Sequence, residues 1–141
     1  MKTLNLEIIT PDKQAYQNQV NSVTAPASSG QIGILPGHMP LFTKLVEGEI
    51  KISKDNEEIY FAIGGGFLEV INDRVEILVT SAYHADELNE AELIEAQKRA
   101  KQALSEKPSG GALIEAQAQF RRSQIALKVL SRRRRHLPSG S

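Results

Sequence analysis

Residues 30–41 read Gly-Gln-Ile-Gly-Ile-Leu-Pro-Gly-His-Met-Pro-Leu, and this stretch constrains its own backbone unusually tightly. Its three glycines can adopt positive φ angles, and its two prolines fix φ and keep the preceding residues extended. An apolar run from Ile32 to Leu35 lies between these constraints. The pattern predicts a short strand that ends in a rigid turn displaying His38 and Met39.

The segments around this turn, up to about residue 82, alternate apolar and polar residues as half-buried strands do. Turn-forming residues recur between these segments at short intervals. Short strands at that spacing are typical of a β-sandwich or a flattened barrel. The alternating apolar sets are Leu4, Leu6 and Ile8; Ile50 and Ile52; Leu68 and Val70; and Val75, Ile77 and Val79.

After Ala85 the apolar period becomes helical. Asn89 is placed to cap a first helix, and Glu92 occupies the capping-box position three residues later. Residues 107–111, Lys-Pro-Ser-Gly-Gly, are expected to end that helix and form a loop before a second one. Spacings of three and four residues predict an antiparallel hairpin. Its expected seam is Leu93, Ala96, Ala100, Ala103 and Leu104 against Leu113, Ala116, Phe120, Ser123, Leu127 and Leu130.

The predicted fold is therefore α+β. A β-sandwich, or flattened antiparallel barrel, is expected at residues 1–85, and a helical hairpin at residues 86–141 with a disordered tail from about residue 137. The hairpin seam is weak, because each Ala or Ser in place of Leu or Ile forfeits roughly 1–2 kcal/mol of burial. The double glycine at residues 110–111 adds flexibility at the joint. Such an arm is suited to conformational regulation.

Charge divides the chain in the same place. The net charge is zero, yet residues 1–85 hold 6 Lys and Arg against 10 Asp and Glu, and residues 86–141 hold 11 against 7. Residues 112–137 alone carry seven basic residues and one acid. An acidic body with a basic arm indicates that the arm meets an acidic partner. This partner is either a protein or a nucleic acid.

No catalytic or metal constellation is apparent. The three histidines lie in three separate segments, and the absence of cysteine removes disulfides and thiolate chemistry. The glycines at 64–66 lack a following Gly-Lys-Ser/Thr, so a tight hairpin or bulge between two strands is expected there. No apolar run is long enough to span a membrane, and the start shows neither a secretory signal nor a transit peptide.

The arginine run at residues 132–135 has three readings. It suits phosphates of a nucleic acid, although no aromatic residue interleaves with it to stack bases. Cations also complement the dipole at the C-terminal end of a solvated helix. The third reading is contact with an acidic protein surface.

The 30–41 stretch and the block Gly-Gly-Phe-Leu-Glu-Val at residues 65–70 together resemble two motifs of one family. They match the GxxGILPGHxPL loop and the GGFLEV strand of the epsilon subunit of bacterial and chloroplast F-type ATP synthases. The resemblance covers nearly the whole chain. It implies a non-catalytic subunit of the rotor stalk that couples rotation of the c-ring to the catalytic head. The alternative, from a different class, is a free-standing β-sandwich module with a basic helical arm for nucleic acid.

The resemblance also implies contacts. The gamma subunit and the c-ring are the expected partners of the β-domain, and the hairpin is expected to inhibit ATP hydrolysis by meeting an acidic loop of the beta subunit beside alpha. No nucleic acid is expected, and the membrane is reached only through the complex, on the cytoplasmic face of a bacterial cell membrane. The gamma and c-ring residues are Ser29, Gly30, Gln31, Ile32, Pro36, Gly37, His38, Met39, Pro40 and Leu41. The inhibitory residues are Arg121, Arg122, Lys128, Arg132, Arg133, Arg134 and Arg135.

Two departures from the family pattern bear on ligands. Gln31 is neutral where several relatives carry an acid, so a hydrogen bond must replace a charge pair with the c subunit. Some relatives bind ATP through an I/L-D-x-x-R-A motif, which reads Leu-Asn-Glu-Ala-Glu-Leu at residues 88–93 here. Glu92 in place of a cation reverses the sign of its interaction with a polyphosphate. No cofactor or metal is expected, and regulatory ATP is left open, with Asn89, Glu92 and Arg99 as its candidate residues.

Overall fold

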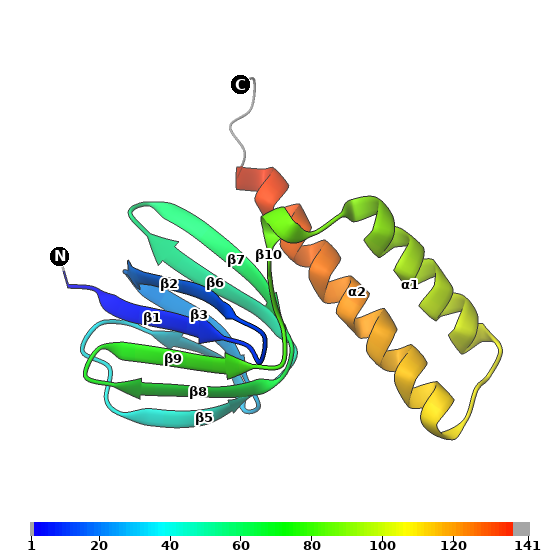
Figure 1. Ribbon diagram of the computed structural model, residues 1–141, viewed down its shortest axis with the longest axis horizontal. Coiled ribbons are helices and arrows are strands. Elements are labelled where there is room, and N and C mark those ends of the chain that lie inside the picture. The colour runs from blue at the N-terminus through cyan, green and yellow to red at the C-terminus, as the bar shows by residue number, and fades with distance from the viewer. Residues whose placement is uncertain (1, 137–141) are drawn as a thin grey trace. The chain divides into compact units, whose positions relative to one another are not determined.

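The structure is a computed structural model that describes residues 2–136, with side chains described up to residue 132. The chain divides between His84 and Ala85 into two compact units. We call the first the β-domain and the second the helical hairpin (Figure 1). The predicted α+β class, with a β-sandwich followed by two helices, is confirmed.

The β-domain is one ten-stranded sheet in the described residues, with strand order β10-β7-β6-β3-β5-β8-β9-β1-β2 and with β4 paired to β3. Neighbouring strands are antiparallel, as predicted, except that β1 runs parallel to β9. This pairing joins the first strand to a strand near the end of the domain. The bounds are β1 Leu4–Ile9, β2 Gln14–Val20, β3 Ser22–Ala27, β4 Gly30–Ile34, β5 Leu41–Leu45, β6 Gly48–Lys54, β7 Glu57–Ile63, β8 Gly66–Ile71, β9 Arg74–Val79 and β10 Ala82–His84.

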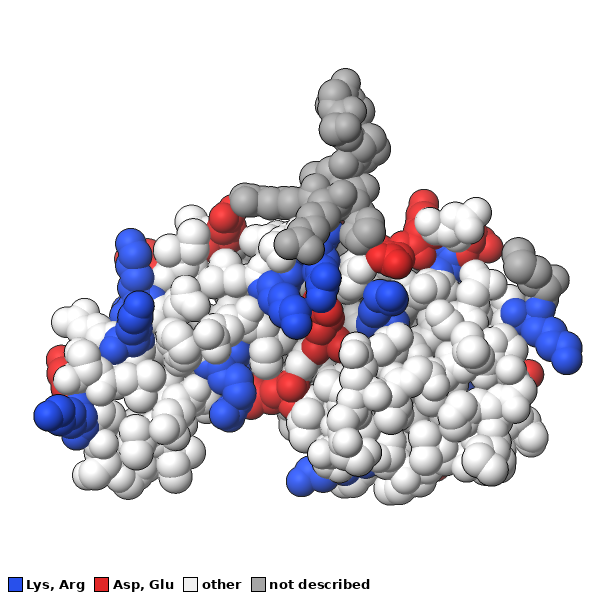
Figure 2. All heavy atoms as spheres, turned by 180° about the vertical axis from the view of Figure 1, so that it is seen from behind, with Lys and Arg blue, Asp and Glu red and all other residues white. Residues whose placement is uncertain are grey.

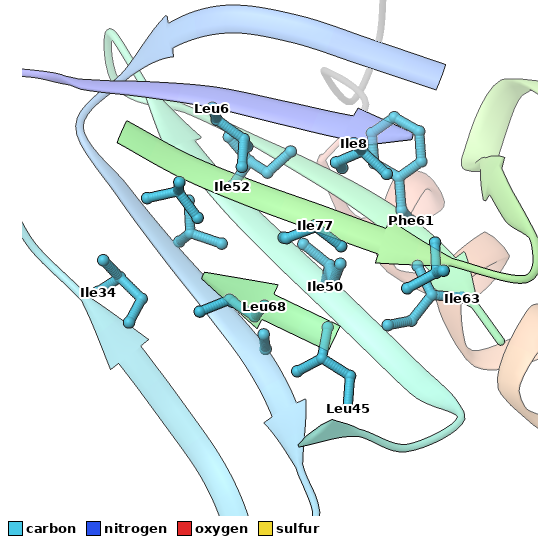
Figure 3. Packing of buried hydrophobic residues seen from close by; sticks show 14 of the residues in the cluster. Leu6, Ile8, Ile34, Leu45, Ile50, Ile52, Phe61, Ile63, Leu68 and Ile77 are labelled. Carbon is cyan, nitrogen blue, oxygen red and sulfur yellow. The ribbon is translucent and has the colours of Figure 1, made fainter. Parts of the chain in front are cut away.

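Large aliphatic side chains fill the interior of the β-domain (Figure 3). Each of the predicted alternating sets points inward, and nearly all of their members are completely buried. Phe61 adds an aromatic ring that meets Tyr16 edge-to-face, with 5.6 Å between ring centroids. Burial of one such aliphatic side chain contributes about 1.5–3 kcal/mol, so the interior holds the ten strands in one register.

The glycines at 64–66 do not form the predicted hairpin or bulge, and that prediction is wrong. Strand β7 pairs with β6 and β10, whereas β8 pairs with β5 and β9, so the glycines connect two strands that are not neighbours. A Cβ atom on Gly66 would lie 1.9 Å from the carbonyl oxygen of Leu78, and one on Gly64 would lie 2.2 Å from Oγ1 of Thr80. Glycine is required at residue 66 because the backbone of β9 passes close by, whereas Gly64 faces side chains of the segment between β9 and β10.

The helical hairpin comprises the short 3-10 helix η1 (Ala85–Glu87) and helices α1 (Glu90–Ser105) and α2 (Gly110–His136). Asn89 caps α1 as predicted, because its side-chain oxygen accepts a hydrogen bond from the backbone N–H of Glu92 at 3.1 Å. Every predicted seam residue is buried or half-buried. The predicted loop is too long, since Gly110 already begins α2 with a φ of 60°.

Candidate functional site

The tip of the β3–β4 hairpin carries the first group of predicted contact residues. Ser28 and Ser29 form its loop, and Gly30 completes the turn with a φ of 127° that an L side chain rarely adopts. Gln31 is exposed, whereas Ile32 packs partly against the core. The tip therefore presents small polar groups and backbone that are accessible to a partner.

The turn after β4 carries the second group. Gly37 has a φ of 84°, and its N–H donates to the carboxylate of Asp73 in the β8–β9 turn at 2.7 Å. The N–H of His38 donates to the carbonyl of Leu35 at 3.1 Å, which closes the turn. Met39 is 73% exposed, but His38 is only half-exposed. The rigid turn and its display of Met39 are confirmed, and His38 is displayed less than predicted.

These two groups lie at opposite ends of β4. An extended strand advances about 3.3 Å per residue, so Gly30 and Ile34 are separated by roughly 13 Å. Gly33, between them, has no positive φ, and a Cβ there would meet nothing within 4 Å. A single partner must extend along the whole strand to touch both the tip and the turn.

An exposed aromatic patch on the outer face of β5, β8 and β9 was missed by sequence reasoning. Phe42 on β5 stacks on Phe67 on β8 with 5.5 Å between ring centroids, and Phe67 lies directly opposite Leu78 on β9. These three side chains, which we call the aromatic patch, are 66%, 47% and 46% exposed, respectively. In the sequence, each of these three strands carries a large apolar residue at a position where the alternation calls for a polar one. Exposed apolar clusters of this kind mark interaction sites.

The predicted inhibitory residues lie on α2. Arg121, Arg122 and Lys128 are exposed, and Arg132 is half-buried. The side chains of Arg133, Arg134 and Arg135 lie outside the described residues, as does the predicted tail from residue 137. Lys and Arg side chains are spread along the hairpin, whereas the face of the β-domain seen in Figure 2 has a broad uncharged area.

The predicted nucleotide residues are not brought together. Arg99 of α1 and Arg122 of α2 line one groove, together with Ala96, Gln119 and Ser123. Asn89 instead caps α1, and Asn89 and Glu92 stand at its start, roughly 15 Å and 10 Å from Arg99, respectively, at 1.5 Å per residue. The groove therefore contains two cations but not the other candidates.

Within residues 2–132, no group of three or more His, Asp or Glu side chains is arranged to hold a metal ion. Neither helix of the described chain has the length and apolar character needed to cross a bilayer.

Comparison with known proteins identifies the family. A family model described as "ATP synthase, Delta/Epsilon chain, beta-sandwich domain" matches residues 3–85. An ATP synthase epsilon chain of Dehalococcoides mccartyi is 42% identical over 137 residues, covering 96% of this chain and 98% of that protein. One of Bacillus cytotoxicus is 38% identical over 128 residues, covering 91% of each chain.

Solved structures show the same fold at lower identity. A chain of the Euglena gracilis mitochondrial ATP synthase (OSCP/F1/c-ring) aligns with a TM-score of 0.68 at 23% identity, covering 92% of this chain and 78% of that one. A chain from the central stalk and c-ring of the Tetrahymena thermophila mitochondrial enzyme aligns with a TM-score of 0.58 at 18% identity, covering 92% and 97%. On the strength of the family model and the near full-length relatives, this chain belongs to the ATP synthase epsilon chain family.

Proposed function

We propose that the chain is a non-catalytic subunit of the central stalk in an F-type ATP synthase, where it couples rotation of the c-ring to the catalytic head. Family membership over nearly the full chain supports this role. The two similar solved structures are of assemblies that include the c-ring, and one of them is of the central stalk together with the c-ring. In this role the chain is peripheral to the membrane, on its cytoplasmic face in a bacterium.

The aromatic patch is the observation that carries the assignment of partners. Stacked, exposed aromatic side chains are costly in water and are typical centres of protein interfaces. We assign this patch to the gamma subunit. The tip at Ser29–Ile32 is assigned to the c-ring, and the turn from Pro36 to Leu41 extends the rotor contact from the far end of β4.

The hairpin is proposed to inhibit ATP hydrolysis by leaving its packed state and meeting beta and alpha subunits. Its seam favours this change, since Ala100, Ala116 and Ser123 are buried where larger side chains would hold the helices more firmly. The hydroxyl of Ser123 donates to the carbonyl of Gln119 within α2 at 2.9 Å, so that bond does not join the helices. Arg121, Arg122, Lys128 and the arginine run at 132–135 supply the attraction to acidic surface.

Removing the hairpin tests this role. A complex carrying the chain without residues 86–141 is expected to assemble and to hydrolyse ATP faster than the wild type. Changing all four arginines of the 132–135 run to Gln should reproduce much of this rise in the rate of ATP hydrolysis. The effect of the four substitutions should be smaller at high salt, where the attraction is already screened. Glu115→Gln is the control, because it leaves the arm more positive and should not raise hydrolysis.

Wild-type hydrolysis rates in both the truncated and the four-arginine complexes would overturn the inhibitory role and leave a coupling subunit only. Nuclease-sensitive material, rather than synthase subunits, pulled down from a detergent-solubilised membrane extract would instead favour the nucleic-acid module.

Nucleotide is proposed not to be a tight regulatory ligand. Arg99 and Arg122 offer two cations in one groove, but Asn89 and Glu92 stand elsewhere on α1. Isothermal titration of the whole chain with Mg-ATP should therefore show no binding tighter than about millimolar, a free energy of roughly −4 kcal/mol. Micromolar binding that disappears in Arg122→Gln would show that the groove arginines suffice.

A further inference from the structure

The turn after β4, at residues 35–40, receives little support from the strands and the core around it. It joins β4 to β5, and these two strands do not pair with each other, since β4 pairs with β3 and β5 pairs with β3 and β8. None of its residues is fully buried, and the side chains of Leu35 and Met39 are exposed. The hydrophobic core therefore contributes little to the position of this turn.

Hydrogen bonds fix the turn instead. The N–H of His38 donates to the carbonyl of Leu35 at 3.1 Å, and Nδ1 of His38 lies 2.6 Å from the carbonyl oxygen of Met39. Both of these bonds are local and would move with the turn as a whole. Among the described residues, the hydrogen bond that ties the turn to a distant segment is the one from the N–H of Gly37 to the carboxylate of Asp73.

The backbone of Asp73 is itself held from two sides. Ile71 on β8 pairs with Arg74 on β9, so Asn72 and Asp73 form a two-residue turn between these strands (Figure 1), with φ angles of 49° and 63°. Positive φ at both residues gives a hairpin turn whose twist matches that of its strands. The backbone carbonyl of Asp73 also accepts the N–H of Asn5 on β1 at 2.8 Å. The carboxylate therefore extends from a fixed backbone and can hold a loop in place.

A second turn of the same geometry shows what this aspartate adds. The β6–β7 turn consists of Asp55 and Asn56, with φ angles of 49° and 68°. Asn56 occupies the position that Asp73 occupies in the β8–β9 turn, and no long-range hydrogen bond from its side chain is found among the described residues. Glycine is the residue best suited to positive φ, so the geometry of the turn does not by itself call for an acid. The bond to Gly37 is what explains a carboxylate at residue 73.

We propose that Asp73 is a positioning residue for the rotor contact, because its carboxylate holds the turn after β4 in the conformation that meets the partner. The proposal rests on the proposed function, which assigns residues 36–41 to that contact. Hydrogen bonds from an N–H to a carboxylate are stronger than those between neutral groups. A turn that is already ordered in the free chain loses less conformational freedom on docking, so Asp73 raises affinity by acting through Gly37.

The first experiment tests the bond in the full-length chain. Asp73→Gly removes the carboxylate and tolerates positive φ, so the β8–β9 turn should keep its shape. Solvent exchange of the Gly37 amide, measured by NMR, should be about tenfold faster than in the wild type, because this amide loses its acceptor. Asp73→Asn keeps an oxygen that can accept the bond and should restore most of the protection. Unchanged exchange of Gly37 in Asp73→Gly would overturn the proposal.

The second experiment measures binding to purified catalytic complex that contains gamma but lacks this chain. Asp73→Gly should bind roughly tenfold more weakly than the wild type, and Asp73→Asn should bind within about twofold of it. A loss in Asp73→Asn as large as that in Asp73→Gly, with the Gly37 amide protected again, would overturn the proposal, because the charge would then act on the partner directly. Heat unfolding of each variant checks that the sheet is formed before binding is compared.

The matched control is Asn56→Gly, which makes the same kind of change at the same position of the β6–β7 turn. Its binding should equal that of the wild type, and a loss equal to that of Asp73→Gly would overturn the proposal. Faster exchange of Gly37 with normal binding of Asp73→Gly would overturn the positioning role and leave the proposed function intact. Failure of the wild-type chain to bind would overturn the proposed function and the positioning role together.

Discussion

The interior of the β-domain and the seam of the helical hairpin are packed with side chains of very different size. In the β-domain, Leu6, Ile50 and Leu68 are completely buried and belong to one continuous core. In the hairpin seam, the most deeply buried positions include Ala100, Ala116 and Ser123. Burial energy grows with apolar area, at about 25 cal/mol per Å², so a seam of alanines gains much less per position than a core of leucines.

This difference assigns different physical properties to the two regions. The β-domain gains a large burial energy at each core position, whereas the hairpin gains less at each position of its seam. Glycines follow the same division. Gly66 sits where the backbone of β9 leaves no room for a Cβ, but Gly110 and Gly111 have nothing within 4 Å of that position.

The largest expected effect is on the tightly packed side of this comparison. Gly66→Ala places a Cβ against the backbone of β9, which can shift only if the sheet distorts. We expect a loss of roughly 3 kcal/mol in the free energy of unfolding, measured by urea denaturation. Gly33→Ala is the control, since a Cβ meets nothing there, and its stability should stay within about 0.5 kcal/mol of the wild type. Equal stability of the two variants would contradict the close strand approach.

A smaller effect is expected in the turn after β4. Pro36→Ala with Gly37→Val removes a fixed φ and forces a β-branched residue into positive φ, at a cost of about 1–3 kcal/mol. The sheet should still form, because the core is untouched. ATP synthesis by membranes carrying the variant should fall. Unchanged synthesis would reduce the turn to a structural element.

The next prediction concerns Asn89, the residue that caps α1 in the helical hairpin. Asn89→Ala removes the acceptor for the backbone N–H of Glu92 and should destabilise α1 by about 1 kcal/mol. Hydrogen exchange should speed up in the first turn of α1 and remain unchanged in the β-domain, because the two units have separate cores. Matching acceleration in both units would show that they unfold as one and would weaken the comparison.

The smallest expected effect is on the free energy of unfolding at alkaline pH. It concerns the β-domain, which contains all three tyrosines. Burial raises the pKa of Tyr16 above its usual 10.0. Because the folded-state pKa is the higher one, this group's stabilisation is complete below about pH 10 and is lost as pH rises through the folded value. Tyr16→Phe should make the alkaline fall in unfolding free energy shallower. If unfolding free energy fell equally steeply with pH in the variant and the wild type, this contribution of Tyr16 would be contradicted.

Local patterns were enough to predict the elements. The alternation at Leu4, Leu6 and Ile8, the cap at Asn89 and the spacing of the hairpin seam all follow from the periods of strands and helices. The aromatic patch was missed because alternation by itself does not say what lies outside a sheet. Phe42 and Phe67 are 25 positions apart in the sequence, and only the β5–β8 pairing brings their rings into contact.

The sequence by itself determined the two-part organisation, the identity of the strands and helices, the basic character of the arm and the family. Each of these depends on residues within a few positions of one another or on direct matching of motifs. Tertiary structure decided the parallel β1–β9 pairing, the crossover at residues 64–66, the separation of the tip from the turn along β4, and the hydrogen bond from Gly37 to Asp73. The reason is physical: strand order and register are set by burial of the whole core at once, and side chains far apart in the chain become neighbours only when that core has formed.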